Sequence, residues 1–543
     1  MGEEKICGYI LGGISLSVDS DPREACRLAA AEMKRSGTSP ARLDLDICKY
    51  SVDARKKKDI RLVYSVAVRP KDGGKIDPPA RCKYNVSPLY DKKLSLKKGT
   101  EKCAEPPLVV GMGPAGLFCA LLLAENGYAP VIIDRGDSVE ERVAAHRRFK
   151  EFGILDGESN IQFGAGGAGT FSDGKLLTRV NDPRVAYVLE RFCDFGAPEE
   201  IKIKAKPHIG TDLLCGIVDS ILKRIEELGG KVLYRTRLDG IRHTPDGCVV
   251  ALTSRGEIKC SSLCLATGHS ARDTYEMLMN SGYSVEAKPF SVGVRIEHLQ
   301  SRIDEALYGD LAGHPRIGKG EYHLSDTTTG RGVYTFCMCP GGEVVAAASE
   351  DGGVVVNGMS SFARDGRNAN SAVCVSVRPD DYGASPRKAI AFQRNLEQKA
   401  YLLGGSDYYA PVQTVGDFLE GKRGGEPTEV LPTYRDGRVR ASSMDELLPD
   451  FVCRELRHGL VSFERKLAGF SSATAILSGV ETRTSSPVRI LRNEELCALG
   501  QDNVYPCGEG AGYAGGITSA AMDGIRVAEK IMERFAPAEG LTI

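Results

Sequence analysis

The chain has 543 residues, 42% of them hydrophobic, which exceeds the roughly 250–300 residues at which a single core stops growing. Its 71 Lys and Arg residues nearly balance 72 Asp and Glu residues, which excludes a global field that would draw it to nucleic acid or an anionic membrane. The longest apolar runs, such as 118–124, are far shorter than the ~20 residues that span a bilayer. We expect two or three domains and no membrane partner.

The cysteines indicate a reducing compartment. All 17 are scattered without the spacing of a disulfide framework, and the N-terminal MGEEKICGYI lacks the layout of a secretion signal. These features predict free thiols and a cytoplasmic location. Cys337 and Cys339 would share one face of an alternating strand, but no second pair or histidine cluster accompanies them, so we predict no metal site.

Residues 1–70 are predicted to form a small α+β domain of βαββ order. Alternating apolar residues over 14–18, 43–47 and 60–68 indicate strands, and Asp21-Pro22-x-Glu24 indicates the start of a helix that ends near Gly37. The turn Arg55–Lys58 is basic and either binds phosphate or nucleic acid or keeps an exposed edge unpaired. The absence of interleaved aromatic residues favours the second interpretation. Residues 71–106, rich in Lys, Pro and Gly, are predicted to be a linker.

The stretch LVVGMGPAGLFCALLLAENGYAPVIIDRG, residues 108–136, has the pattern of a dinucleotide-binding unit. A strand is followed by Gly111, which permits a tight turn, Gly113, which lets a pyrophosphate approach the backbone, and Gly116, which lets the helix pack on the strand. The helix directs its unpaired N–H groups and positive dipole end at phosphate oxygens. Asp134 ends the second strand, 23 residues after Gly111, where a carboxylate accepts hydrogen bonds from the ribose 2′-OH.

A second glycine-rich loop near the far end of the chain favours FAD over NAD. The loop GEGAGYAGGI, residues 508–517, precedes a long predicted helix. In FAD proteins of the glutathione-reductase type, a distal segment of this kind returns to the first domain, where its acid binds the ribityl chain. Glu509 matches that position, although the usual residue is Asp. The turn Ala266-Thr267-Gly268 resembles a strand-end motif that these flavoproteins also carry.

Over nearly its whole length the sequence resembles the large family of FAD-dependent dehydrogenases often labelled NAD(FAD)-utilising dehydrogenases. The resemblance rests on motifs such as GGAGTFSDGKL, KPHIGTDLL, VYTFCMCPGGEVV, NGMSSFARDGRNANSA and YPCGEGAGYAGGITSAAMDG. The glycine run of the family is usually preceded by an acid, where this chain has Ala165. The resemblance implies FAD as the cofactor.

The resemblance also implies a set of cofactor-binding residues. Those expected at the adenosine and pyrophosphate are Gly111, Gly113, Pro114, Ala115, Gly116, Asp134, Arg135 and Arg142. Those expected near the flavin or at the ribityl end are Gly166, Gly167, Thr170, Gly268, Gly508, Glu509, Gly516 and Ile517.

Catalytic side chains cannot be assigned from the sequence, because a flavin performs the hydride chemistry itself. No CxxxxC pair lies near 150–180, which disfavours disulfide reduction by the route of the related reductases. No second strand-linked GxGxxG occurs in mid-chain, so NAD(P)H is expected only as a transient reductant. Acid–base chemistry near a flavin suggests the candidates Lys175, His208 and His269, together with Ser172, Asp173 and Arg295 in the same predicted cleft.

The predicted fold is α/β, with a discontinuous Rossmann-type FAD-binding domain (107–280 and 473–543), an inserted mixed α+β substrate domain (281–472) and the small N-terminal α+β domain. The predicted function is that of an FAD-dependent oxidoreductase, a dehydrogenase or reductase, which transfers hydride between the flavin and an unidentified small-molecule substrate. Two alternatives stay open: an RNA-modifying or RNA-binding flavoprotein, motivated by the basic turn although nucleic acid is disfavoured, and a non-catalytic flavin redox sensor.

Overall fold

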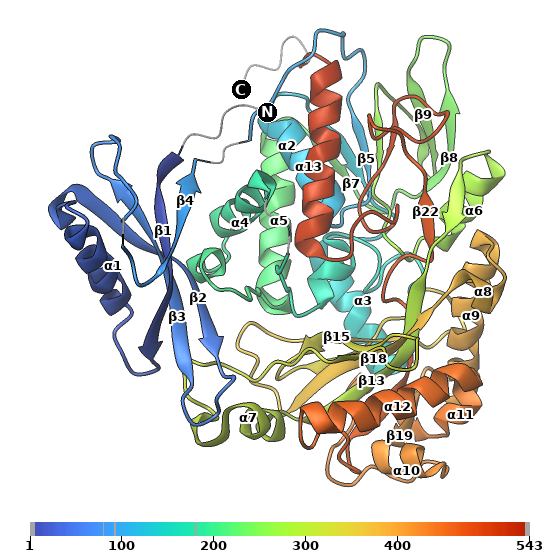
Figure 1. Ribbon diagram of the computed structural model, residues 1–543. Coiled ribbons are helices and arrows are strands. Elements are labelled where there is room, and N and C mark those ends of the chain that lie inside the picture. Colours follow the sequence, from blue (N-terminus) through green and yellow to red (C-terminus); the bar gives the residue numbers. More distant parts are fainter. Residues whose placement is uncertain (1–5, 80, 92–93, 179, 181, 538–543) are drawn as a thin grey trace. The chain divides into compact units, whose positions relative to one another are not determined.

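The computed structural model describes residues 6–79, 81–91, 94–178, 180 and 182–537 (Figure 1). The chain divides into two compact units. The first comprises 1–95, 179–208 and 304–320, and the second comprises 96–178, 209–303 and 321–543. Each unit therefore combines segments that lie far apart in the sequence, and each is described by itself below.

The first unit is built on a four-stranded antiparallel sheet in the order β2-β3-β1-β4. Its elements are β1 (Ile6–Ser17), α1 (Arg23–Arg35), β2 (Leu43–Asp53), β3 (Arg61–Pro70) and β4 (Asn85–Tyr90). Helix α1 runs along one face of the sheet (Figure 1) and contributes Ala25, Ala29 and Met33 to its core. Strand β4 lies inside 71–106, so the linker prediction is corrected for its residues, which bond to the edge of β1.

Two later segments complete this unit. The backbone N–H of Tyr50 donates to the carbonyl of Ile203 at 2.7 Å, and that of Ala205 donates to the Tyr50 carbonyl at 2.9 Å. The guanidinium of Arg316 donates to the Val18 carbonyl at 2.7 Å and to the Tyr64 hydroxyl at 2.8 Å. Residues 1–70 alone therefore do not make up the whole unit. Its other elements are α4 (Pro183–Asp194) and the 3₁₀ turns η1 (Pro40–Arg42), η3 (Glu199–Lys202) and η4 (Gly309–Leu311).

The second unit contains a five-stranded parallel sheet of Rossmann type in the order β23-β11-β5-β6-β7. Its strands are β5 (Leu108–Val110), β6 (Val131–Ile133), β7 (Lys231–Leu233), β11 (Leu263–Leu265) and β23 (Val504–Pro506). The central strands β5 and β11 are wholly apolar and buried, as is usual in parallel sheets covered on both faces. Helices α2 (Pro114–Glu125), α5 (Thr211–Glu227) and α13 (Ile517–Arg534) stand side by side, with α2 in contact with both others (Figure 1).

A seven-stranded, mainly antiparallel sheet forms the other large layer of this unit. In spatial order its strands are β14 (Ser325–Asp326), β15 (Val333–Cys339), β18 (Asn368–Val377), β13 (Phe290–Leu299), β21 (Ile476–Glu481), β19 (Ala410–Thr414) and β20 (Val439–Ala441). Strand β21 pairs with β13 and β19, although the sequence assigned everything after 472 to the nucleotide-binding domain. The boundary at 472–473 is therefore corrected, because β21 completes this sheet.

Further strands and helices complete the described part of the chain. The remaining strands are β8 (Leu238–His243), β9 (Val249–Thr253), β10 (Gly256–Cys260), β12 (Val285–Ala287), β16 (Glu343–Ala346), β17 (Val356–Met359) and β22 (Val488–Ile490). The remaining helices are α3 (Val139–Phe152), α6 (Arg272–Asn280), α7 (Gln300–Tyr308), α8 (Pro379–Tyr382), α9 (Pro386–Leu403), α10 (Val415–Glu420), α11 (Met444–Leu447) and α12 (Asp450–Lys466), with 3₁₀ turns η2 (Gly167–Phe171) and η5 (Tyr434–Gly437). Within the described ranges, no helix combines the length and apolarity needed to cross a membrane.

Candidate functional site

Glycine turns from both ends of the second unit meet at the carboxyl edge of the parallel sheet. A Cβ atom on Gly111, whose φ is 105°, would lie 2.2 Å from the Ala266 carbonyl oxygen, so the turns after β5 and β11 are in contact. A Cβ atom on Gly510 would lie 2.4 Å from the carbonyl oxygen of Gly268. The loops that follow β5, β11 and β23 therefore lie against one another, although some 400 residues separate the first from the last along the chain.

Helices α2 and α13 pack so closely that a side chain would not fit between them. A Cβ atom on Gly524 of α13 would lie 2.0 Å from the carbonyl oxygen of Ala115 in α2, and one on Gly508 would lie 2.7 Å from the Ala115 Cβ. Asp523, on the same helix, accepts a hydrogen bond from the backbone N–H of Gly508 at 2.8 Å. This contact fixes the C-terminal glycine loop beside the first one.

The glycine run before η2 adds a third wall. The backbone N–H of Gly166 donates to the carbonyl of Met112 at 2.8 Å, and a Cβ atom on Gly167 would lie 2.9 Å from the Gly113 Cα. The hydroxyl oxygen of Thr170 is buried and has no hydrogen-bond partner among the described residues. An unpaired buried hydroxyl next to two glycine turns is available to a ligand group.

Two helix N-termini face open space at this edge. Helix α2 begins after Gly113 and α13 after Gly516, and in the described part of the chain no side chain caps either helix. The nearest atom to a Cβ on Gly113 would be 3.9 Å away, and a Cβ on Gly268, Gly515 or Gly516 would meet nothing within 4 Å. Free N–H groups and positive dipole ends beside open space fit a dinucleotide with its pyrophosphate and its anionic ring.

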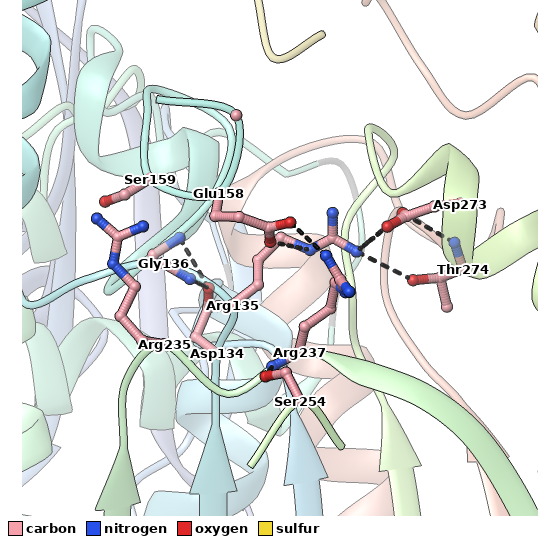
Figure 2. A network of polar contacts seen from close by, with 12 residues as sticks. Asp134, Arg135, Gly136, Glu158, Ser159, Arg235, Arg237, Ser254, Asp273 and Thr274 are labelled. Carbon is pink, nitrogen blue, oxygen red and sulfur yellow. Dashed lines mark hydrogen bonds and ion pairs between the residues drawn. The ribbon is translucent and has the colours of Figure 1, made fainter. Parts of the chain in front are cut away.

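Asp134 is mainly an organiser of the turns. Its carboxylate accepts hydrogen bonds from the backbone N–H groups of Met112 at 2.8 Å, Gly136 at 2.9 Å and Gly164 at 2.8 Å. Figure 2 shows the contact with Gly136. A carboxylate offers about four lone-pair sites, so three are already occupied and one is left for a ribose hydroxyl. The ribose contact stays a prediction. The hydrogen bonds by which Asp134 links Met112, Gly136 and Gly164 are present in the structure.

Arg135 closes the same edge through ion pairs. Its guanidinium lies 2.7 Å from the Asp273 carboxylate at the start of α6 and 4.5 Å from the centroid of the Phe163 ring. Glu158 lies between Arg135, at 3.8 Å, and Arg237, at 2.6 Å (Figure 2). The Arg135 guanidinium is thus held by the Asp273 and Glu158 carboxylates, and Glu158 also holds Arg237. A contact of Arg135 with adenosine stays a prediction.

Arg142 has no exposed surface with which to contact a nucleotide, so the expected direct contact is corrected. Its guanidinium donates to the carbonyls of Asn160 and Ile161 at 2.9 Å, of Gly167 at 3.1 Å and of Ala165. Burial lowers the pKa of Arg142 to about 10, which leaves it charged at neutral pH. Arg142 therefore holds the glycine run in shape from behind.

The candidate acid–base residues separate into different environments. Lys175 lies 2.5 Å from the Asp173 carboxylate, which is fully buried and also paired with Arg364. His269 is buried with its Nδ1 3.0 Å from the Ser270 hydroxyl, and burial, followed by the charges of Arg483 and Arg272, lowers its pKa to about 3. The imidazole of His269 is therefore neutral at physiological pH.

The other sequence-predicted residues are also placed. His208 is buried and belongs to the first compact unit, whereas Lys175 and His269 belong to the second. Ser172 donates to the Gly169 carbonyl at 2.7 Å, within the glycine run. Arg295 has no exposed surface and lies 3.1 Å from the Glu481 carboxylate, so its prediction as a cleft residue is corrected.

Glu509 is partly buried in the C-terminal loop. Burial raises its pKa to about 7, while the charge of Lys288 acts in the opposite direction. Both protonation states of this carboxyl are therefore populated near neutral pH. A side chain with this property beside the proposed ring-binding end can respond to the charge of what binds there.

The sequence does not indicate the local structure around Cys337 and Cys339. The sequence pattern raises only the question of metal binding for this pair. Among the residues that the structure describes, no group of three or more His, Cys, Asp or Glu side chains could hold a metal ion. The backbone at Cys337 is left-handed, with a φ of 46°, which the alternating pattern of the sequence does not indicate. At the basic turn of the first unit, Arg55 is bonded to Asp53 at 2.6 Å and 2.8 Å, and RNA binding there stays a prediction.

Three comparisons with known proteins bear on the chain. Residues 289–484 match the family model described as FAD-dependent protein, C-terminal domain-like. An uncharacterised protein of Clostridium beijerinckii is 46% identical over 538 residues, which cover 97% of this chain and 98% of the relative.

Solved structures show weaker similarity. Glycine oxidase from Geobacillus kaustophilus is 11% identical, with 81% of this chain and 97% of that chain covered at a TM-score of 0.32. L-proline dehydrogenase from P. horikoshii is 14% identical, with 80% and 94% covered at a TM-score of 0.34. At these scores neither structure bears on the substrate.

Proposed function

Since the chain belongs to the family of its Clostridium beijerinckii relative and carries a domain of FAD-dependent proteins, we propose that it transfers hydride between one bound FAD and a small-molecule substrate. FAD dependence follows from the family model, and a flavin accepts and donates electrons. The chain is thus an FAD-dependent oxidoreductase. What we propose beyond this is that hydride passes between the FAD and a small-molecule substrate.

The observation that carries this proposal is the meeting of the glycine turns after β5, β11 and β23 with two uncapped helix N-termini. The N–H groups at the start of α2 would hold the pyrophosphate, and those at the start of α13 would face the ring end. Asp134 and Arg142 keep the turn after β5 and the glycine run before η2 in position, because their hydrogen bonds reach Met112, Gly164 and Gly167. When bound, FAD supplies the hydride chemistry.

We further propose a division of labour along the chain. Residues 107–280 and 485–543 would bind the nucleotide, and residues 281–484, which contain the seven-stranded sheet and the family-matched segment, would bind the substrate. All 17 cysteines are free thiols, which supports a reducing compartment such as the cytoplasm. NAD(P)H would enter only as a transient reductant.

Anaerobic reduction of the FAD-loaded protein tests the proposal. The visible flavin absorbance is followed while NADH, NADPH and a panel of small amino acids, hydroxy acids and alcohols are added one at a time. We expect one small-molecule class to bleach the flavin rapidly and reoxidation to restore it. Bound FAD that no small molecule reduces would favour a redox sensor, and a chain that binds no FAD would contradict the proposal altogether.

A further inference from the structure

A β-bulge brings two cysteines together at the end of β15. Phe336 pairs with Ala372 of β18, but Cys339 pairs with Asn370, so β15 carries one extra residue between these positions. Cys337 takes up the extra residue with a left-handed backbone. In a regular strand two residues that share a face stand roughly 7 Å apart along the chain. At this bulge the thiol of Cys339 instead turns back on Cys337 and donates to its carbonyl at 3.4 Å.

The side chains of Arg295 and Lys175 donate hydrogen bonds to backbone carbonyls of the bulge. Arg295 donates to the Cys337 carbonyl at 2.6 Å and lies 3.5 Å from the Cys339 sulfur. Lys175 donates to the carbonyl of Met338 between them. The neighbouring Cys339 thiol, and then the charges of Arg295 and Lys175, lower the pKa of Cys337 against the effect of burial, whereas the pKa of Cys339 is raised. The direction of these two pKa shifts favours a thiolate at Cys337 and a thiol at Cys339.

The bulge is joined to the proposed flavin end of the site. Lys175 follows the glycine run, and the carbonyl of its neighbour Leu176 accepts a hydrogen bond from the Thr518 hydroxyl, in the first turn of α13, at 2.8 Å. The charge of Cys337 also acts on Glu509 and raises its pKa. The cysteine pair thus lies within electrostatic reach of the loop that precedes α13.

We propose that Cys337 and Cys339 form a redox-active dithiol that exchanges electrons with the flavin. The inference rests on the proposed function, because it needs bound FAD as the electron acceptor. Arg295 and Lys175 are positioning residues that stabilise the thiolate.

The exchange balances without a further reactant. In the oxidative direction an S–S bond forms between the Cys337 thiolate and Cys339, and the S–H bond of Cys339 breaks. The pair releases two electrons and one proton, and oxidised FAD takes up both electrons and the proton to give the anionic reduced flavin. In the reverse direction the reduced flavin returns them to the disulfide. The dithiol would therefore store a second electron pair beside the cofactor.

A second thiol group in the same unit provides a matched control. Cys264 of β11 and Cys507 after β23 are adjacent and wholly buried, and burial raises the pKa of Cys507 well above its usual value. A thiol that stays protonated is a poor nucleophile. This pair differs from the first in its charge environment, because the pKa of Cys507 is raised and that of Cys337 is lowered.

The test is an anaerobic titration of the FAD-loaded protein with dithionite after mild oxidation. The wild type should take up about four electrons per flavin, and Cys337→Ser and Cys339→Ser about two, because a disulfide is a two-electron couple. Cys507→Ser should behave as the wild type. In the mass spectrum of the oxidised, alkylated protein, the peptide that contains 337–339 should be unlabelled and lighter by two hydrogen atoms.

Several outcomes would overturn the inference. The inference is wrong if the FAD-loaded wild type takes up only two electrons, or if both cysteines are fully alkylated after oxidation. It is also wrong if Cys337→Ser still takes up four electrons. Failure of the proposed function gives a different result, because a chain without flavin absorbance fails before any titration and takes this inference with it.

Discussion

The Asp134 carboxylate determines the shape of the nucleotide edge, because it joins the turn after β5, its own turn after β6 and the glycine run before η2. Its hydrogen-bond donors among the described residues are the backbone N–H groups of Met112, Gly136 and Gly164. An Asn side chain would direct its own N–H₂ group at one or more of these donors and leave a buried N–H unsatisfied.

We therefore expect Asp134→Asn to destabilise the protein by about 1–3 kcal/mol and to weaken FAD binding. Thermal unfolding and FAD titration measure the two effects. The control is Asp239→Asn, whose carboxylate is 40% exposed and pairs with Arg237 at the surface, and which should cost less than about 1 kcal/mol. Equal effects of the two substitutions would show that Asp134 does not organise the turns.

A second residue-scale prediction concerns the buried charge cluster around Glu397. Its carboxylate lies 2.8 Å from both Arg272 and Arg483, and all three side chains are at most 2% exposed. Burial acts to raise the pKa of Glu397, but Arg483 and Arg272 outweigh it and hold the pKa well below the usual range. The stabilisation by this carboxylate is therefore present above the pKa of the unfolded chain, ~4.3, and is lost as the pH falls.

Glu397→Gln should cost about 3–5 kcal/mol at pH 7, because it leaves the buried Arg483 guanidinium without its carboxylate partner and Arg272 with Glu350 alone. The difference in melting temperature between variant and wild type should narrow as the pH falls below ~4. Glu276→Gln, which removes an exposed pair with Arg387, is the control and should have little effect. A pH-independent difference would contradict the assigned charge state.

At the residue scale, the positions that need glycine can be predicted from the sequence. The bonding partners of the buried charged residues cannot. The roles of Gly111, Gly113 and Gly116 follow from local strand–turn–helix geometry. The partners of Arg142 and Arg295 depend on carbonyl and carboxylate groups in other segments, and a single sequence does not show which segments will meet.

At the scale of elements, the contact between α2 and α13 is the one on which the site depends. Gly524 allows α13 to reach the first turn of α2, and Gly524→Ala would insert a methyl group 2.0 Å from the Ala115 carbonyl oxygen. We expect the helices to separate, with a loss of about 1–3 kcal/mol of stability and of most FAD affinity.

Gly216→Ala, in the middle of α5, is the matched helical control, because its Cβ would meet nothing within 4 Å. Alanine there should be neutral or stabilising by about 0.5–1 kcal/mol. Melting curves and flavin retention on gel filtration compare the two variants, and unaltered flavin retention in Gly524→Ala would mean that the contact does not support the site.

Elements with a strong local pattern could be predicted, and those defined by pairing could not. The apolar spacing of 211–228 and the following Gly229-Gly230 predict α5 almost to its ends. Strand β4 and the bulge in β15 exist because of hydrogen bonds to β1 and β18, and composition alone suggested a linker and a regular strand. Likewise, β21 was assigned to the wrong layer because its neighbours in the sheet are remote in sequence.

At the scale of the whole molecule, the first unit draws on three separate segments. Its core includes Tyr308 and Ile317 from 304–320, in addition to residues of the N-terminal sheet. A fragment of residues 1–106 would expose the surfaces that these side chains cover. We expect it to be aggregation-prone or to melt well below the full chain, and circular dichroism and light scattering measure this. A monomeric fragment as stable as the full chain would show that the later segments add little.

The most direct test of the account is FAD binding by Gly113→Ala. The φ of Gly113 is −73° and its Cβ would have no neighbour closer than 3.9 Å, so the protein should fold normally with alanine there. The added methyl group would occupy the space that the pyrophosphate needs. Calorimetric titration should find one FAD per wild-type and Gly216→Ala chain and at least about 100-fold weaker binding, ~2.7 kcal/mol, by Gly113→Ala at an unchanged melting temperature of the FAD-free protein. Equal FAD affinity in all three would contradict the claim that the glycine turns hold the nucleotide.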